Sequence, residues 1–185
     1  SERDRIPQLR ERLLSAGQRL ELREVGRAAL ELAGLEAGFF NVRRHVREGL
    51  TPVELQLQWR VTPGRAFPGA TVLDAHRKAP RGRVTLVTSD RELAIDAQIS
   101  LDGSTVGRVL DAGRSHTRDE WLGLALLDVA VGHPGLAGFT SGEARVRTIS
   151  APATNNRSLW VDPQRHSWAT RDKTPFPPLV RPAWS

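Results

Sequence analysis

Few residues in this chain combine the type and the spacing that catalysis needs. His116 and Asp119 could form an acid/base pair, but they fall in a predicted loop without a nucleophile. The 185 residues include no cysteine, which excludes a thiol nucleophile, a disulfide and a cysteine metal site. The five histidines do not occur at metal-ligand spacing. From these residue types we expect no metal site and no catalytic residue.

The charge of the chain leaves several classes of partner open. There are 27 Lys and Arg residues against 21 Asp and Glu, a net charge of +6. This excess could reflect a solvated surface, attraction for an anionic ligand or partner, or nucleic-acid binding. The basic residues are spread along the chain among acids, and no basic run carries the spaced aromatics of a nucleic-acid site. We therefore expect no nucleic-acid partner.

The apolar residues argue against a membrane protein. No apolar run reaches the roughly 18–20 residues that a membrane span needs, and the charged start, Ser1–Asp4, lacks the apolar stretch of a signal peptide. We expect a cytoplasmic protein without a membrane partner.

The first forty residues predict two helices. The segment Ile6–Leu20 has a proline in its first turn and one apolar face, formed by Leu9, Leu13, Leu14 and Leu20. A short extended piece, Leu20–Val25, leads into a second helix, Arg27–Leu35, rich in Ala and Leu. Gly38 is the expected stop signal for that helix.

A turn and a loop follow. Thr51 and Glu54 have the spacing of a capping box at the start of a helical turn. The apolar anchors of this region are Val53, Leu55, Leu57 and Trp59, and we expect Trp59 in the core. Prolines and glycines at residues 63–69 predict a loop.

From residue 83 the apolar period changes to two, which predicts short strands. The pair Asp102-Gly103 is a hairpin turn signal. The predicted strands cover residues 84–88, 97–101, 105–110, 121–129 and 144–149. Together they predict an α+β chain with a helical N-terminal segment and a small antiparallel β-barrel. Beyond Pro152 we expect an extended Pro/Trp-rich tail that docks on the barrel or on a partner, because its three tryptophans are costly to leave in water.

Several motifs occur in the order seen in one enzyme family. They resemble the second half of aminomethyltransferases, the glycine-cleavage T-protein family and its folate-dependent demethylase relatives. The matching segments are Gly26–Leu30, Leu35–Gly38, Thr51–Glu54 with Leu57 and Trp59, Phe67–Ala70, Arg83–Val87, Gly103–Val109 and Gly123–Val129. The iron–sulfur-repair relatives are excluded, because their signature contains a cysteine.

The resemblance implies an organisation and a function. Residues 1–75 would be a remnant of the folate-binding region, residues 76–152 the family's C-terminal barrel, and residues 153–185 the tail. In the family, the preceding half carries the catalytic aspartate, so a second protein subunit would supply it. The chain would then be part of a split tetrahydrofolate-dependent methyltransferase or demethylase. Alternatives are a non-catalytic folate-fold scaffold or regulatory module, and a nucleic-acid-binding barrel.

The resemblance also assigns cofactor-binding residues. Glu36 occupies the position whose carboxylate accepts the two pterin donors of tetrahydrofolate. Arg65 is placed where relatives meet the folate tail, and Trp59 is either core or a stacking wall. For Arg27 we favour an ion pair over a folate contact. Two departures, Gly34 and the segment 39–42, argue against the lipoyl protein substrate of glycine cleavage and favour an N- or O-methyl small molecule.

Overall fold

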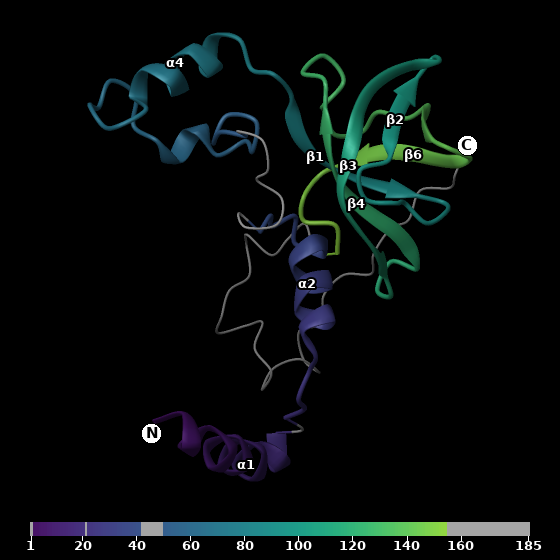
Figure 1. Cartoon of the computed structure of the whole chain (residues 1–185). Coiled ribbons are helices and arrows are strands. Elements are labelled where there is room, and N and C mark those ends of the chain that lie inside the picture. Colours follow the sequence, from purple (N-terminus) through teal and green to yellow (C-terminus); the bar gives the residue numbers. More distant parts are fainter. Residues whose placement is uncertain (1, 21, 42–49, 155–185) are drawn as a thin grey trace, which may run out of the picture. The chain divides into compact units, whose positions relative to one another are not determined.

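The computed structural model describes residues 2–20, 22–41 and 50–154 (Figure 1). Contacts divide the chain into two compact units, Ser1–Glu31 and Leu32–Ser185. The predicted tail lies outside the described residues from residue 155 onward. The predicted divisions near residues 75 and 152 stay predictions.

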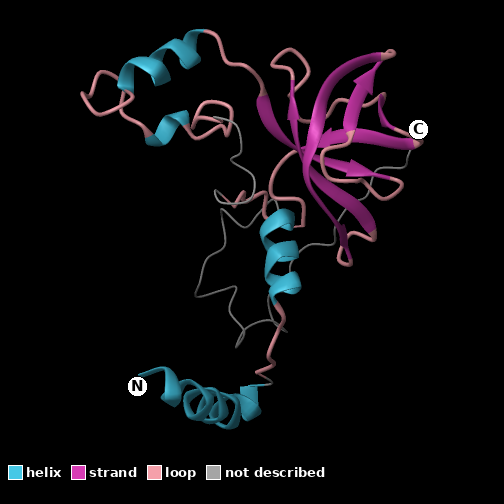
Figure 2. Ribbon diagram, viewed as in Figure 1, coloured by secondary structure: helices cyan, strands magenta, loops and turns pink. Residues whose placement is uncertain are grey.

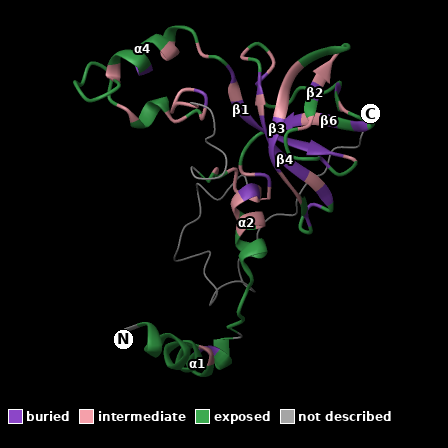
Figure 3. Ribbon diagram, in the orientation of Figure 1, coloured by how far each residue is buried: buried purple, intermediate pink, exposed green. Residues whose placement is uncertain are grey.

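The first unit is helical and has almost no interior. It contains a 3-10 turn, η1 (Glu2–Arg5), then α1 (Ile6–Gly17) and a second 3-10 turn, η2 (Gln18–Leu20). Gly17 is the one buried residue among those described in this unit (Figure 3). The predicted helix is therefore present, but its apolar face is exposed rather than packed.

The second helix, α2 (Arg27–Glu36), ends two residues before the predicted stop signal, Gly38. Gly38 has φ 72°, and its N–H donates to Leu35 O (2.9 Å), while the N–H of Phe39 donates to Gly34 O (2.8 Å). These two bonds satisfy carbonyls at the helix end. A Cβ at Gly38 would also lie 2.5 Å from the Ala151 side chain, so both the backbone conformation and the packing require glycine here.

Residues 50–80 contain a helix that the sequence patterns did not predict. After the turn at 51–56 come η3 (Gln58–Arg60) and α4 (Ala70–Lys78). Only Leu73 of α4 is buried, so the helix lacks the repeated apolar positions that periodicity detects. The placement of Trp59 in the core is wrong, because its side chain is 70% exposed.

Residues 83–149 form the predicted antiparallel barrel, which closes in the order β1-β4-β3-β2-β5-β6. Its strands are the magenta arrows of Figure 2. The turn Asp102-Gly103 joins β2 to β3, with φ of 50° and 78° as a two-residue hairpin turn requires. The three-residue β5 is too short to show a period and was not predicted. The strands are β1 (Arg83–Ser89), β2 (Gln98–Leu101), β3 (Ser104–Ser115), β4 (Glu120–Leu127), β5 (Phe139–Ser141) and β6 (Ala144–Ile149).

Two apolar clusters use alternate residues of the same strands. Val87 and Ala125 belong to the cluster inside the barrel, whereas Leu86 and Leu124 belong to a second cluster with Leu35 of α2. Because successive side chains of a strand point to opposite faces, the second cluster lies on the outer surface of the sheet. The C-terminal end of α2 therefore packs on the barrel, and this packing fixes the position of Glu36.

Candidate functional site

Glu36 is the last residue of α2, and both its backbone and its side chain are held. Its carbonyl accepts a hydrogen bond from Ala153 N (2.6 Å), and its Oε1 accepts one from Ser115 Oγ (2.5 Å). The residue is half-buried. Glu36 is therefore not a helix-end glutamate surrounded by solvent, because its carboxylate is bonded to the end of β3.

Ser115 also fixes the turn between β3 and β4. Its Oγ accepts a hydrogen bond from Arg118 N (3.1 Å), and Asp119 closes the turn with φ 56°. The Asp119 carboxylate accepts from Arg114 (2.5 Å). The sequence-based acid/base reading of His116 and Asp119 is not supported, since the described partner of Asp119 is an arginine.

A buried charge cluster lies next to this turn. Arg118 and Glu120 are both nearly inaccessible to solvent, and their side chains form an ion pair (Nη2 to Oε2, 2.9 Å). Arg147 of β6 donates to the other oxygen of Glu120 (3.2 Å), and Thr88 of β1 donates to Oε2 (3.1 Å). One carboxylate thus ties three strands together.

Arg118 also connects this charge cluster to the segment that follows β6. Arg118 Nη1 donates to the carbonyl of Ala153 (2.6 Å), the residue whose N–H holds the end of α2. A continuous path of hydrogen bonds therefore runs from Glu36 through Ser115 and Arg118 to Glu120. We call Glu36, Ser115, Arg118, Glu120 and Arg147 the Glu36 network.

Glu54 forms a second buried polar site. Its Oε2 accepts from Thr51 N (2.8 Å), as the capping box predicts, and also from Thr51 Oγ1 (2.5 Å), a bond that the capping box does not include. Its Oε1 is 2.8 Å from Nδ1 of His76 in α4. Burial raises the pKa of the Glu54 carboxyl, but the hydrogen bonds from Thr51 and His76 outweigh it and lower the pKa to about 2. The ionised carboxylate of Glu54 therefore links the turn at residues 51–56 to α4.

The other residues assigned to the cofactor do not gather around Glu36. Arg27 forms the favoured ion pair, with Glu31 (2.8 Å), on the exposed surface of α2 in the first unit. Trp59 lies under the guanidinium of Arg60, which is 4.6 Å from the ring centroid. Arg65 is exposed in the loop before α4. Among the described residues, no contact joins Trp59 or Arg65 to Glu36.

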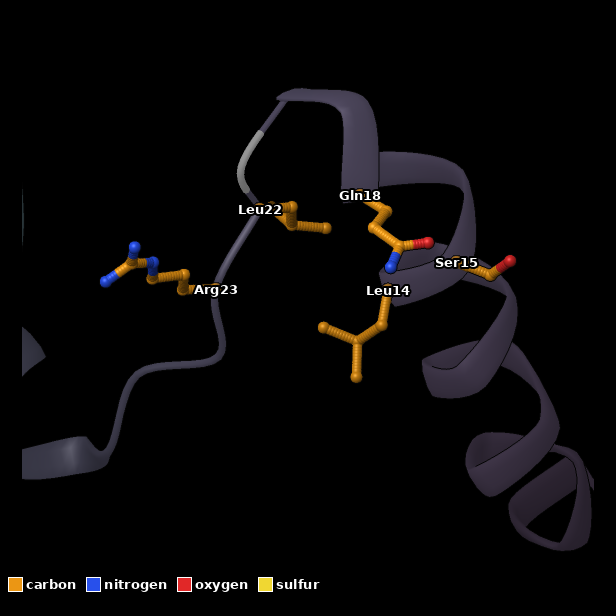
Figure 4. A pocket seen from close by; sticks show the side chains of 5 residues that line it. All are labelled: Leu14, Ser15, Gln18, Leu22 and Arg23. Carbon is orange, nitrogen blue, oxygen red and sulfur yellow. The ribbon is translucent and has the colours of Figure 1, made fainter.

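The described residues offer a pocket elsewhere. It lies between the end of α1 and the segment that follows, and Leu22 points back toward the helix (Figure 4). None of the residues assigned to the cofactor lines it. Within ranges 2–20, 22–41 and 50–154 no group of His, Asp and Glu could hold a metal ion, and no helix there is long and apolar enough to cross a membrane. The residues lining the pocket are Leu14, Ser15, Gln18, Leu22 and Arg23.

Sequence reasoning missed most of the Glu36 network. Ser115 and Arg118 are sequence neighbours of His116 and Asp119. The groups that they bond in the network include Glu36, 79 residues from Ser115, and Ala153, 35 residues from Arg118. A partial signal exists in the hairpin itself, because Ser115 and Glu120 are paired at its two ends. That pairing follows from the strand register, whereas the approach of α2 does not.

Comparisons with known proteins place the chain in a family. No protein-family model matches it. An aminomethyltransferase of Corynebacterium aurimucosum is 32% identical over 136 residues, which are 71% of this chain and 37% of that protein. The crystal structure of the glycine cleavage system aminomethyltransferase T from Bartonella henselae shares the fold with a TM-score of 0.70 and 21% identity, over 80% of this chain and 44% of that one.

The chain spans less than half the length of either protein. The sequence match and the shared fold agree with the order of motifs and with the barrel. The chain is therefore an aminomethyltransferase-like protein that corresponds to part of the length of that family's members.

Proposed function

We propose that this chain is one subunit of a split tetrahydrofolate-dependent methyltransferase or demethylase of the cytoplasm. It would move a one-carbon group from an N- or O-methyl small molecule to tetrahydrofolate. The catalytic aspartate would belong to a second subunit, which carries the N-terminal folate-binding half. This chain would supply Glu36 and cover the bound cofactor.

The observation that carries the proposal is the fixed carboxylate of Glu36. An ionised carboxylate only accepts hydrogen bonds, and within the described part of the chain Ser115 occupies Oε1 alone. Oε2 and the remaining lone pair of Oε1 suit two adjacent donors, which a pterin presents as its 2-amino group and a ring N–H. Tetrahydrofolate, when bound, supplies the nitrogen that accepts the one-carbon group.

Two exposed side chains suit the rest of the cofactor. Arg65 is exposed in its loop, and a guanidinium there could bind the carboxylates of the folate tail as a planar fork. The exposed face of Trp59 could stack on an aromatic ring. Arg27, paired with Glu31, is the weakest of the assigned residues.

The exposed apolar side chains of the first unit support the proposal of a second subunit. Its large apolar side chains are exposed, and its one buried residue among those described is a glycine. A short helical segment with no core of its own gains its stability from packing against another surface. We assign that surface to the second subunit, since this chain spans 37% of the length of the curated relative. The exposed residues are Ile6, Leu9, Leu13, Leu20, Leu22, Val25 and Leu30.

Reconstitution tests the proposal. The chain would be co-expressed with a polypeptide carrying an N-terminal folate-binding half, and methyl transfer to tetrahydrofolate would be measured for each part and for the mixture. We expect turnover only in the mixture, because each half lacks groups that must be aligned on the cofactor. Turnover by this chain alone would contradict the split arrangement.

Substitution of Glu36 separates cofactor binding from assembly of the two subunits. Glu36→Gln keeps the shape of the side chain but replaces one acceptor oxygen with a donor, so tetrahydrofolate binding by the mixture should weaken by about 1.5–3 kcal/mol. The control is Glu143→Gln, at an exposed ion pair with Arg91. A complex that forms and binds no folate would favour the alternative of a non-catalytic scaffold.

A further inference from the structure

We infer that Ser115 is a positioning residue, which holds the Glu36 carboxylate in the orientation that a ligand meets. The inference rests on the proposed function for the identity of that ligand. The contact itself is independent of it, because Ser115 Oγ lies 2.5 Å from Oε1 of Glu36. Neither the capping of α2 nor the pairing of the strands requires this hydrogen bond.

The direction of the hydrogen bonds at Ser115 is fixed by chemistry. The N–H of Arg118 can only donate, so Ser115 Oγ accepts from it at 3.1 Å. The carboxylate of Glu36 can only accept, so the hydroxyl hydrogen must point toward Oε1. The hydroxyl therefore uses its donor on Glu36 while its acceptor is held by the turn, and it is completely buried.

The rest of the Glu36 network makes this serine rigid. The Arg118 side chain is bonded to Glu120 (2.9 Å) and to Ala153 O (2.6 Å), and these bonds restrain the turn from which the Arg118 N–H donates to Ser115. Ala153 in turn holds the carbonyl of Glu36 (2.6 Å). The turn between β3 and β4 therefore holds both parts of Glu36: the carboxylate through Ser115, and the backbone carbonyl through Ala153 and Arg118.

Fixing this side chain has a consequence for binding. A free glutamate loses rotamer freedom when a ligand orders it, and that loss weakens the binding. A carboxylate already ordered by Ser115 avoids most of the loss. The serine would therefore raise ligand affinity without touching the ligand.

The test compares Ser115→Ala with Ser89→Ala in the full chain. Ser89 is a matched control, because it is also fully buried, accepts from a backbone N–H two residues on (Arg91, 3.2 Å) and donates to a carbonyl (Arg91 O, 2.7 Å). Both variants lose a buried hydroxyl of a barrel strand. Only one of them changes the surroundings of Glu36.

The first readout needs no ligand. Side-chain scalar couplings of Glu36, measured by NMR, should report a single rotamer in the unsubstituted chain and in Ser89→Ala, and averaging in Ser115→Ala. The methyl signals of Val87 and Ile99 in the barrel interior show whether each variant is folded. Unchanged couplings in a folded Ser115→Ala would overturn the inference, whatever the ligand.

The second readout is an NMR titration with tetrahydrofolate of this chain mixed with the second subunit. We expect Ser115→Ala to weaken binding by about tenfold, the scale of the rotamer freedom that a free glutamate loses when a ligand orders it, and Ser89→Ala to leave binding unchanged. In a Glu36→Gln background, Ser115→Ala should have little further effect, because a positioning residue acts through Glu36. Equal losses in the two serine variants would overturn the inference. Absence of binding by the unsubstituted chain together with the second subunit would count against the proposed function, while the couplings still decide the role of Ser115.

Discussion

His76 Nδ1 lies 2.8 Å from Oε1 of Glu54, and this contact joins α4 to the turn at residues 51–56. The same turn is attached to the barrel, since Val84 N at the start of β1 donates to the Glu54 carbonyl (2.7 Å). Gln56 adds a side-chain bond to Val84 O (2.7 Å). Glu54 thus links the segment before the barrel to β1 through its carbonyl and to α4 through its carboxylate.

The ionisation of Glu54 should make stability depend on pH. Its pKa is lowered from 4.5 to about 2 in the folded chain, so the folded state favours the ionised form. The stabilisation is present above pH 4.5 and is lost as the pH falls toward 2. We expect Glu54→Gln to lower the free energy of unfolding by roughly 3 kcal/mol at neutral pH, measured by urea denaturation.

The acid side of the same experiment provides the check. The difference between Glu54→Gln and the unsubstituted chain should shrink as the pH falls from 4.5 toward 2. Glu143→Gln serves as the control, because that side chain is 85% exposed, and it should change stability by less than about 0.5 kcal/mol. A difference that stays constant with pH would mean that Glu54 acts only through its shape.

Two arginines of the β3–β4 turn should differ sharply in their contribution to stability. Arg118→Ala removes one of the two arginines that pair with the buried Glu120 and leaves it with Arg147 and the Thr88 hydroxyl, and the expected loss is about 3–5 kcal/mol. Arg114→Ala breaks an exposed pair with Asp119, and the expected loss is below about 1 kcal/mol. Chemical denaturation of both variants measures this, and similar losses would show that the buried cluster is not the stabilising element.

Substitution of Trp59 should barely affect folding. Its ring is 70% exposed, so Trp59→Ala should change the free energy of unfolding by less than about 0.5 kcal/mol. Phe139→Ala removes a side chain that is 1% exposed inside the barrel, and should cost about 3–5 kcal/mol. Thermal unfolding distinguishes the two. A large loss in Trp59→Ala would restore the reading of this residue as core.

The apolar face of α1 should be needed for association with the second subunit. Replacing Leu9 and Leu13 together by Asp removes two exposed leucines, and the dissociation constant should rise by more than about a hundredfold. The matched control places Asp at Gln8 and Ser15, one face away and with the same change in charge. Sedimentation of each variant with the co-expressed partner measures binding, and equal effects in the two double variants would exclude this face.

Local sequence patterns were enough to predict the barrel and the two N-terminal helices. Alternation of apolar residues predicted five of the strands, because a residue's place on one face of a strand depends on its neighbours at a spacing of two. The Asp102-Gly103 turn, the stop at Gly38 and the capping box of Thr51 and Glu54 were predictable because their bonds join residues close in sequence. The motifs that indicated the family could also be recognised from the sequence, because each is a short run of neighbouring residues.

The surroundings of the candidate site depend on contacts between segments that are distant in the sequence. Whether Glu36 faces solvent or the barrel depends on the packing of Leu35 against β1 and β4, and its partner Ser115 is 79 residues away. Burial of Arg118 and exposure of Trp59 were likewise set by contacts between distant segments. Periodicity records which residues are apolar, but the free energy of burial depends on which surfaces meet, and that is settled only when the elements pack.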